Sequence, residues 1–301
     1  MSEHAEWQIV GRATLTAADL SAIQELEQVC NRFEALALKL NWELMRARPA
    51  GPTSDFLAYR GGTLVGYAAL DGFGNERELT GMVHPVYRRQ GIGRALLQRA
   101  LTACRGQGVT KILLVCEHAS QSGRAYIDAS GRQLFLDSSE YHLQLDASLG
   151  APPRPAPGPL QLRQAGAADV ELLTQIQARS FGVAEERARE HVAQHLAEAG
   201  SRIYLGEVAG MAVGSVGAIR EAAGVYVRGL GVLPEFQGRG YGRGILALVI
   251  AAILAEGDTR LALDVATGNR SALALYQSCG FVETNRYDYY AVKLDGPPET
   301  R

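Results

Sequence analysis

The sequence predicts an α/β protein built from two tandem copies of one domain, and three observations predict it. The 301 residues suffice for two domains of ordinary size. Residues 150–159 include five prolines at the midpoint of the chain, a composition that favours an extended spacer. A Val-x-Pro-x-aromatic step followed by a glycine-rich turn begins at Val83 and again at Val232, which indicates an internal repeat.

The repeat sets the expected domain boundaries. Several residues of the first copy recur in the same order in the second: Gly91, Gly93 and Arg94 match Gly240, Gly242 and Arg243, Gly131 matches Gly280, and Arg12 and Asp19 parallel Arg163 and Asp169. We therefore expect one domain in residues 1–149, a linker in 150–159 and a second domain in 160–301.

Composition limits the classes of function. Hydrophobic residues make up 47% of the chain, enough for a packed core in each half. The net charge of −2 argues against a general electrostatic grip on nucleic acid or an anionic membrane. The longest apolar run, 245–255, is too short for a membrane span, the first residues lack the apolar core of a signal peptide, and the four cysteines form no CxxC pair. We expect a cytoplasmic protein with no nucleic-acid, membrane or metal partner.

Hydrophobic patterning predicts a similar order of elements in both copies. Thr16 and Asp19 resemble a capping box, which predicts the start of a helix. The apolar residues 245–254 predict a helix buried against a sheet. Strands are expected at about 8–12, 57–60, 63–70 and 79–83 in the first copy and at 161–163, 203–207, 211–219, 225–232, 261–265 and 287–294 in the second, with a helix at 271–278.

Two glycine-rich loops, residues 88–94 and 237–243, carry the strongest functional signal. Each joins a predicted strand to the start of a helix, where unpaired N–H groups and the helix dipole attract anions, and arginines add charge. A phosphate or pyrophosphate ligand is therefore expected. The dinucleotide-binding pattern GxGxxG fails because Leu96 stands at the third glycine of the first loop, and no lysine follows a glycine as a Walker A loop requires.

These loops resemble the signature of the GNAT superfamily of acyl-CoA-dependent N-acyltransferases, Gln/Arg-x-x-Gly-x-Gly/Ala after a hydrophobic-x-Pro step. The segment from Asn269 to Tyr276 and the Cys279-Gly280-Phe281 turn resemble the superfamily's closing segment. The resemblance covers nearly the whole chain as two tandem domains, a layout similar to that of mycothiol synthase. For each domain it implies a mixed, mostly antiparallel central sheet flanked by helices.

The resemblance also implies a reaction and its site. Acetyl-CoA, or another acyl-CoA, is the implied co-substrate, and the primary amine of a small molecule or peptide attacks its thioester directly. The Leu230 N–H would meet the acyl oxygen, and Tyr276 would protonate the leaving thiolate. The implied cofactor-binding residues of the second copy are Leu230, Gly231, Val232, Gln237, Gly238, Arg239, Gly240, Tyr241, Gly242, Arg243 and Asn269. Those of the first copy are Gly81, Met82, Val83, Arg88, Arg89, Gln90, Gly91, Ile92, Gly93 and Arg94.

The copies depart from the superfamily's acid–base pattern in different ways. Many members carry a glutamate base on the strand before the loop, where this sequence has Arg77 and Tyr226, so the base is a water chain, a carboxylate such as Glu221, or absent. The first copy has Ile127 at the tyrosine position, with Tyr126 one residue away, and Ser120 at the asparagine position. We expect the second copy to catalyse, and the first to bind CoA structurally or to have an empty cleft.

Other interpretations stay open from the sequence. The missing glutamates favour a non-catalytic acyl-CoA-binding or sensing module, and acetylation similar to that by mycothiol synthase is a third hypothesis. His191 and His195 lack a third metal ligand, so we interpret them as a solvent-facing helix surface. We interpret His84 as a turn residue and Cys279 as a packed thiol. The tandem copies predict either a monomer in a pseudo-dimeric arrangement or a homodimer.

Overall fold

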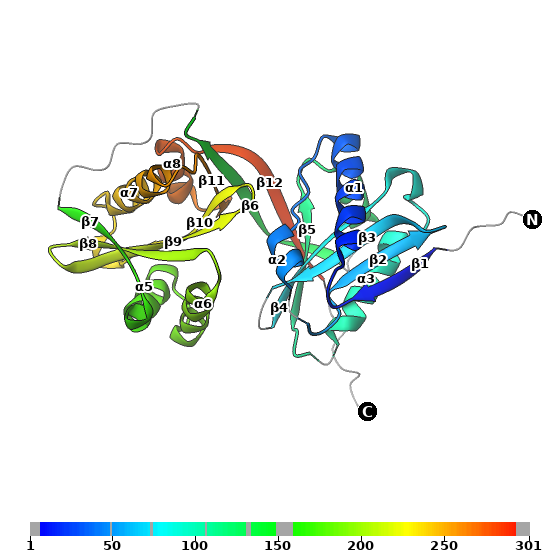
Figure 1. Cartoon of the computed structure of the whole chain (residues 1–301), viewed down its shortest axis with the longest axis horizontal. Helices are drawn as coiled ribbons and strands as arrows, with labels where there is room; N and C mark the ends of the chain where they lie inside the picture. Colours follow the sequence, from blue (N-terminus) through cyan, green and yellow to red (C-terminus); the bar gives the residue numbers. More distant parts are fainter. Residues whose placement is uncertain are drawn as a thin grey trace, which may run out of the picture. The chain divides into compact units, whose positions relative to one another are not determined.

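The computed structural model describes residues 7–48, 50–72, 75–105, 107–130, 134–148 and 159–292 (Figure 1). The chain separates into two compact units: unit 1 comprises Met1–Ser139 and Asn285–Arg301, and unit 2 comprises Glu140–Thr284. These ranges differ from the expected domains 1–149 and 160–301, because the closing strand of each unit comes from the other half of the sequence. The expected linker, apart from Pro159, and the expected match of Gly131 to Gly280 lie outside the described residues.

Unit 1 is a mixed sheet with helices on both faces. Its strands follow the order β1-β2-β3-β4-β5-β12, and every pairing from β1 to β5 is antiparallel except that of β4 with β5. The strands are β1 (Gln8–Arg12), β2 (Asp55–Arg60), β3 (Thr63–Asp71), β4 (Glu76–Val83), β5 (Lys111–Glu117) and β12 (Val282–Val292). The helices are α1 (Ala17–Glu34), α2 (Trp42–Ala47), α3 (Ile92–Cys104) and α4 (Gln121–Ala129).

Unit 2 repeats this plan. Its strand order is β7-β8-β9-β10-β11-β6, and β10 and β11 form the parallel pair. The strands are β7 (Leu160–Gln164), β8 (Ser201–Val208), β9 (Met211–Glu221), β10 (Gly224–Val232), β11 (Arg260–Ala266) and β6 (Leu134–Asp146). The helices are α5 (Val170–Phe181), α6 (Glu185–Ala197), α7 (Tyr241–Ala255) and α8 (Arg270–Ser278).

The closing strands are exchanged between the two halves of the sequence. Strand β6 follows α4 in the first half, yet residues 140–146 pair antiparallel with β11 of unit 2. Strand β12 follows α8 in the second half, yet residues 287–291 pair antiparallel with β5 of unit 1. Two copies of one fold offer two equivalent sheet edges, so such an exchange preserves the pairing of each sheet. It also brings side chains from the first half of the sequence into unit 2.

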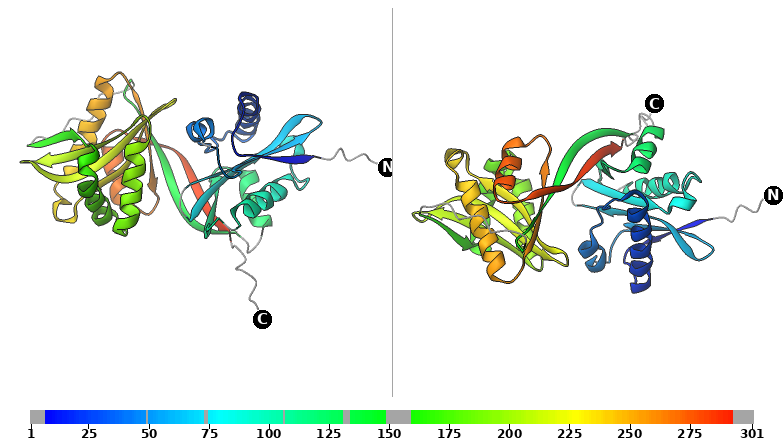
Figure 2. Two further views of the ribbon diagram at one scale, coloured as in Figure 1. Left: turned by 60° about the horizontal axis from the view of Figure 1, so that its bottom comes forward. Right: turned by 90° about the horizontal axis from the view of Figure 1, so that it is seen from above.

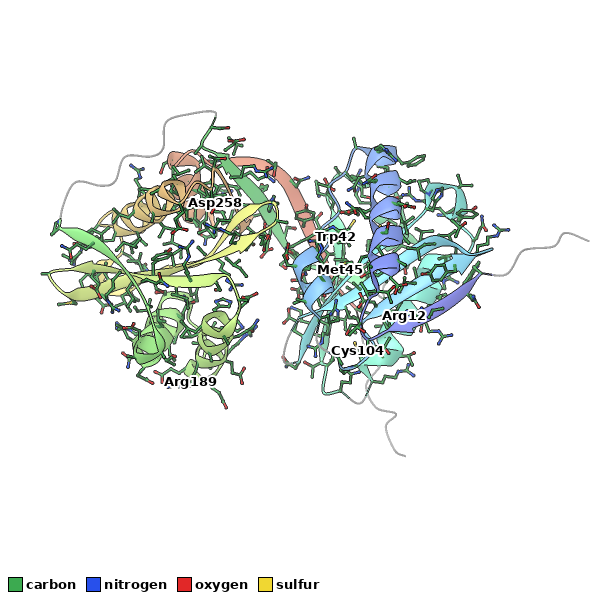
Figure 3. All side chains as sticks on the ribbon, in the orientation of Figure 1. Arg12, Trp42, Met45, Cys104, Arg189 and Asp258 are labelled. Carbon is green, nitrogen blue, oxygen red and sulfur yellow. The ribbon has the colours of Figure 1, made fainter. Side chains whose placement is uncertain are left out.

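Helices cover both faces of the sheet in each unit, as the views in Figure 2 show. In unit 2, α7 packs against β10 and β11 in one cluster that includes Ile250, Val225 and Leu263, whereas Leu173 of α5 and Val192 of α6 belong to a second cluster. In unit 1, α3 and α4 contribute to one cluster, and α1 and α2 contribute to another that contains Met45 of α2 (Figure 3).

Most predicted elements are present. Thr16 and Asp19 form the predicted capping box of α1, with Asp19 N donating to Thr16 Oγ1 at 3.1 Å. Most of the large apolar side chains of the predicted run in α7 are buried, among them Ile245, Ile250 and Ile253. The largest boundary difference concerns the strand predicted at 287–294, because the observed strand begins at Val282. No helix of the described residues is long and apolar enough to cross a membrane.

Candidate active site

The parallel strands β10 and β11 of unit 2 separate beyond a short ladder. Their pairing consists of Val225 with Leu261 and Tyr226 with Ala262. Beyond Tyr226, β10 continues to pair with β9. Backbone groups in the second half of β10 that point toward β11 are thus left without partners in a parallel ladder. This is the stretch that contains the predicted residues Leu230, Gly231 and Val232.

A β-bulge interrupts β10 at the same place. Arg228 pairs with Gly217 and Gly231 with Ser215. Two residues of β10 therefore lie between these pairs, opposite a single residue of β9. Gly229 has a φ of +60°, a left-handed conformation that suits glycine. Its carbonyl accepts a hydrogen bond from Gln177 Nε2 of α5 at 3.1 Å. A bulge of this kind redirects the backbone and interrupts the ladder, here at Gly229 and Leu230.

The loop after β10 offers an open anion site at the start of α7. Gln237 Nε2 donates to the carbonyl of Val232 at 2.9 Å, which fixes the entry to the loop. Gly238 and Gly240 have φ values of +72° and +82°, and a Cβ at either position would meet nothing within 4 Å. Open space beside the first turn of a 15-residue helix fits a pyrophosphate, because its N–H groups and dipole attract negative charge. The nearby side chains of Arg239 and Arg243 are exposed.

Gly242 has a packing role instead. A Cβ at Gly242 would lie 3.0 Å from Leu275 Cδ1, so the absence of a side chain lets α8 approach α7 closely. Helix α8 also carries Tyr276, whose ring meets that of Phe281 edge-on at 6.2 Å between centroids. Burial raises the pKa of Tyr276, which keeps its hydroxyl protonated near neutrality, as a proton donor requires. The loop and the tyrosine helix are therefore held together.

Asn269 is the N-cap of α8. Its Oδ1 accepts hydrogen bonds from Ala272 N and Ser271 Oγ, both at 3.1 Å. This contact positions the first turn of the helix that carries Tyr276.

Unit 1 lacks the bulge although its loop is similar. Strand β4 pairs with β3 in a continuous register from Glu78 to Val83, so Gly81, the counterpart of Leu230, lies opposite Ala68. Arg88 Nε donates to the carbonyl of Val83 at 3.0 Å, as Gln237 does to Val232 in unit 2. The two loops thus share their entry contact, whereas the strands that precede them differ.

Arg88 makes a second contact that has no equivalent at Gln237. Its guanidinium pairs with the carboxylate of Glu34 at the end of α1. Glu34 also accepts hydrogen bonds from Ser120 Oγ at 3.1 Å and from Ser122 N at 3.2 Å. Burial disfavours the charge of Glu34, but the hydrogen bonds from Ser122, Arg88 and Ser120 prevail and lower its pKa. We call Glu34, Arg88, Ser120 and Ser122 the polar clasp.

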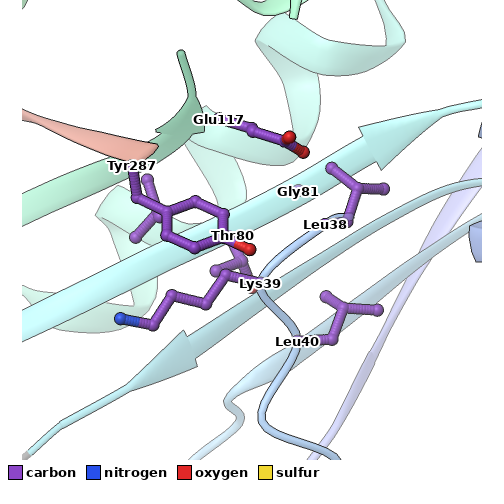
Figure 4. Close-up of a pocket in the computed structure, with 8 residues that line it drawn as sticks. Leu38, Lys39, Leu40, Thr80, Gly81, Glu117 and Tyr287 are labelled. Carbon is purple, nitrogen blue, oxygen red and sulfur yellow. The ribbon is translucent and has the colours of Figure 1, made fainter. Parts of the chain in front are cut away.

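The space between β4 and β5 of unit 1 is filled by the chain between α1 and α2 (Figure 4). Ala37 N donates to Glu117 Oε2 at 2.7 Å, Tyr287 Oη donates to the carbonyl of Ala37 at 2.8 Å, and Lys39 Nζ donates to Tyr289 Oη at 2.6 Å. The cavity that remains measures about 10 Å³, roughly the space of one water molecule. It is lined by Leu38, Lys39, Leu40, Thr80, Gly81, Val115, Glu117 and Tyr287.

The tyrosine of unit 1 corresponds to a packing residue of unit 2. Tyr126 donates to the carbonyl of Gly93 at 3.3 Å, and its ring covers Gly93 as Leu275 covers Gly242. Ile127, at the position of Tyr276, is buried. The hydroxyl that unit 2 has at this position is therefore missing in unit 1.

The remaining candidates have structural surroundings. His84 Nδ1 accepts from Val86 N at 3.3 Å, as expected for a turn residue, and Cys279 is buried. His191 is exposed, but His195 is not fully solvent-facing, and burial together with the charge of Arg228 lowers its pKa to about 4. Within the described residues, no three His, Cys, Asp or Glu side chains are grouped to hold a metal ion.

One pair in unit 2 was missed by sequence reasoning. His142 of β6 lies opposite Asp264 of β11, with His142 Nδ1 2.6 Å from Asp264 Oδ1. The two residues are 122 positions apart, and His142 precedes the proline-rich stretch. Only the strand exchange joins them.

A comparison with models of protein families identifies the family of both units. The model of the acetyltransferase (GNAT) family matches residues 20–128 in unit 1 and 170–281 in unit 2. The chain belongs to the GNAT family. Both units are therefore GNAT domains, each with the mixed sheet that the resemblance implied.

Several named acetyltransferases are similar to this chain. The chain is 28% identical to a mycothiol acetyltransferase of Sanguibacter keddieii, over 90% of this chain and 92% of the relative. It is 31% identical to the mycothiol acetyltransferase of Clavibacter michiganensis, over 71% of each chain. An aminoglycoside N(6')-acetyltransferase of Stenotrophomonas maltophilia is 31% identical over 44% of this chain and 94% of its own.

Solved structures share the fold over nearly the whole chain. A GCN5-related N-acetyltransferase from Sphaerobacter thermophilus superposes with a TM-score of 0.77 at 19% identity, covering 94% of this chain and 95% of the other. A tandem GNAT protein from the clavulanic acid biosynthesis pathway has a TM-score of 0.74 at 17% identity, with 97% and 100% covered.

Proposed function

We propose that this GNAT protein transfers an acetyl group from acetyl-CoA to the primary amine of a small molecule, and that unit 2 is the catalytic unit. The observation that carries the proposal is the bulge at Gly229 and Leu230, in the strand that leads to an open glycine loop. An unpaired backbone N–H beside an anion site is what a thioester linked to a pyrophosphate requires.

Acetyl-CoA would lie along β10. The pyrophosphate would occupy the start of α7 at Gly238–Arg243, and the pantetheine arm would follow Val232. The N–H of Leu230 would donate to the thioester oxygen, where negative charge develops during attack. The exposed guanidinium groups of Arg239 and Arg243 would add charge to the phosphate site.

The chemistry needs few groups. The neutral amine forms a bond to the thioester carbon, and the carbonyl electron pair moves to the oxygen that faces Leu230. The carbonyl then re-forms and the carbon–sulfur bond breaks, so the sulfur leaves with the electron pair. Tyr276 donates its hydroxyl proton to that thiolate, and the proton lost by the new amide nitrogen restores Tyr276 through water.

The acceptor class is supported by the relatives. Full-length similarity to mycothiol acetyltransferases favours a small amine, and among small amines a thiol-bearing precursor of that kind is the first to test. Similarity of a single domain to an aminoglycoside acetyltransferase keeps amino sugars as the second class.

The test is acceptor-dependent release of CoA over a panel of thiol-bearing amines, aminoglycosides, polyamines, amino acids and peptides. We expect turnover with one class of small amine and a mass increase of one acetyl group in the product. Binding of acetyl-CoA without acetylation of any amine would contradict the proposal and favour a non-catalytic acyl-CoA-binding module.

A further inference from the structure

The His142–Asp264 pair of unit 2 lies on the face of the sheet that α5 and α6 cover. Leu261 and Leu263 of β11 and Leu143 of β6 belong to the cluster packed against α7. Side chains alternate along a strand, so Asp264 and His142 point to the opposite face. Asp264 is two residues beyond Ala262, the last residue of β11 that pairs with β10. The pair therefore stands where β10 and β11 separate.

The repeat relates this position to the bulge. The counterpart of Asp264 in unit 1 is Val115, and Val115 lines the small cavity between β4 and β5 together with Thr80 and Gly81. Thr80 and Gly81 are the counterparts of Gly229 and Leu230. Because the sheets follow one plan, the side chain of Asp264 points toward the space in front of the bulge, where the acetyl group is proposed to lie.

The hydrogen bond between the two side chains sets the role of each imidazole nitrogen. A carboxylate accepts, so Nδ1 of His142 donates to Asp264, and the second nitrogen, Nε2, presents a lone pair. Gln144 Nε2 lies 3.3 Å from that nitrogen, as expected for an amide donating to a lone pair. The His142 side chain is 20% exposed and that of Asp264 only 9%, so the imidazole is the more accessible member of the pair.

We infer that His142 is the general base that deprotonates the acceptor amine, and that Asp264 is the residue that positions it. The inference rests on the proposed function. It supplies the base that Tyr226 cannot provide at the usual strand position. The substrate ammonium takes the place of Gln144 as the hydrogen-bond donor to Nε2 of His142 and loses one proton to that nitrogen. His142 passes the proton to solvent, and the lone pair released on the substrate nitrogen attacks the thioester carbon.

Unit 1 has no equivalent pair in this position. Val115 lies opposite Tyr289, which is held by Lys39. Unit 1 does contain a second histidine–aspartate pair, His118 with Asp288, at the same 2.6 Å. Asp288 also accepts from Ser139 Oγ and Arg286 Nε, so this pair belongs to a polar cluster of unit 1. It provides a matched control of identical chemistry.

Strand alternation places further charged or titratable groups on the same face of the sheet as the pair, because their neighbours in sequence belong to the cluster on the α7 face. These groups are Glu140 of β6 and Tyr226 and Arg228 of β10. Arg228 in turn pairs with Glu198 and lies near His195 of α6.

The experiment compares His142→Gln, Asp264→Asn and His118→Gln with the wild type in amine acetylation across pH 5.5–9. We expect His142→Gln to lower kcat by about 10²–10⁴-fold, the usual contribution of a general base. The acidic limb of the pH profile should disappear with it, while the acetyl-CoA affinity and the melting temperature stay within error. Asp264→Asn should give a smaller loss of kcat with a displaced acidic limb, and His118→Gln should match the wild type.

Two results would overturn the inference. If His142→Gln kept the kcat and pH profile of the wild type, His142 would not be the general base. If His118→Gln lost as much kcat as His142→Gln, the loss would reflect a general effect on folding. If His142→Gln fails to fold, the pH profile of Asp264→Asn decides in the same way. Absence of acetylation by the wild-type protein would instead contradict the proposed function, and the inference would fall with it.

Discussion

Strand β10 of unit 2 and strand β4 of unit 1 have equivalent neighbours and end in similar glycine loops, but they differ by one residue of register. The extra residue of β10 leaves Gly229 and Leu230 without ladder partners on β9, whereas Gly81 of β4 stays opposite Ala68. The loop alone therefore does not distinguish the unit that we propose to be catalytic from the other. The two units differ instead in the strand before the loop, which contains a bulge in unit 2 and none in unit 1.

The second difference concerns the space where the two parallel strands of each sheet separate. In unit 1 the polar clasp links the glycine loop to α1 and α4, and the chain from Ala37 to Leu40 closes the space beside Thr80. In unit 2 only three residues, 182–184, connect α5 to α6, and Gln237 has no charge with which to form such a clasp. We expect unit 1 to be a structural domain.

The largest effect is expected from a charge placed in the unit 2 loop. Gly240→Glu should abolish acetyl-CoA binding and turnover, because its side chain enters open space and its carboxylate repels the pyrophosphate. Gly240→Ala has the same backbone strain without the charge. It should bind acetyl-CoA more weakly than the wild type does, but still with a measurable affinity. Gly91→Glu, at the matching position of unit 1, should leave turnover unchanged, as steady-state kinetics will show. Equal losses in the two glutamate variants would remove the distinction between the units.

The next effect concerns the proton donor. Tyr276→Phe removes one hydroxyl with little change in volume, so kcat should fall by about 10²–10⁴-fold while acetyl-CoA affinity is kept. Tyr126→Phe in unit 1 should change neither. Full activity of Tyr276→Phe would mean that the thiolate leaves without help from this side chain.

A smaller loss is expected from disturbing the bulge. Gly229→Val places a β-branched residue at a φ of +60°, which favours a different path of β10 and misplaces the Leu230 N–H. Loss of one oxyanion donor lowers kcat by about 10²–10³-fold in other enzymes, and a partial displacement should cost less. Thr80→Val at the counterpart position is the control. An unchanged kcat for Gly229→Val would contradict the role of the bulge.

The smallest effect concerns stability and belongs to unit 1. Glu34→Gln weakens charged hydrogen bonds and should lower the free energy of unfolding by about 1.5–3 kcal/mol without affecting kcat. The pKa of Glu34 is lowered in the folded state from its usual 4.5, so its contribution is complete above that pH and is lost on acidification. The difference between wild type and Glu34→Gln should therefore shrink below about pH 4.5, as urea unfolding at several pH values will show. A difference that grows on acidification would refute the assignment.

Sequence reasoning reached the features that short stretches of chain determine. The capping box at Thr16, the apolar helix α7 and the paired glycine loops depend on neighbouring residues, and all are present. The strand exchange was not predicted, because an antiparallel closing strand fits either sheet edge. Its hydrophobic pattern does not indicate which strand it pairs with. A signal for the bulge existed: Gly229 within a strand, where the first copy has Thr80, is typical of a bulge.

The site was predicted less completely for the same reason. The repeat indicated the two loops and the resemblance to the GNAT superfamily implied Leu230, whereas the His142–Asp264 pair needs a contact between residues 122 positions apart in different sequence halves. The polar clasp depends on Glu34, distant in sequence from Arg88, and a single arginine in a loop does not reveal its partner. Asn269 was expected to line the cofactor cleft, and the structure adds a local role as the N-cap of α8.

The central claim is that one of the two similar loops holds acetyl-CoA. Isothermal titration of the full chain with acetyl-CoA measures the number of sites directly. We predict one site per chain in the wild type, one in Gly91→Glu and none in Gly240→Glu. Two sites per chain, or a site that survives Gly240→Glu and is lost in Gly91→Glu, would contradict the account.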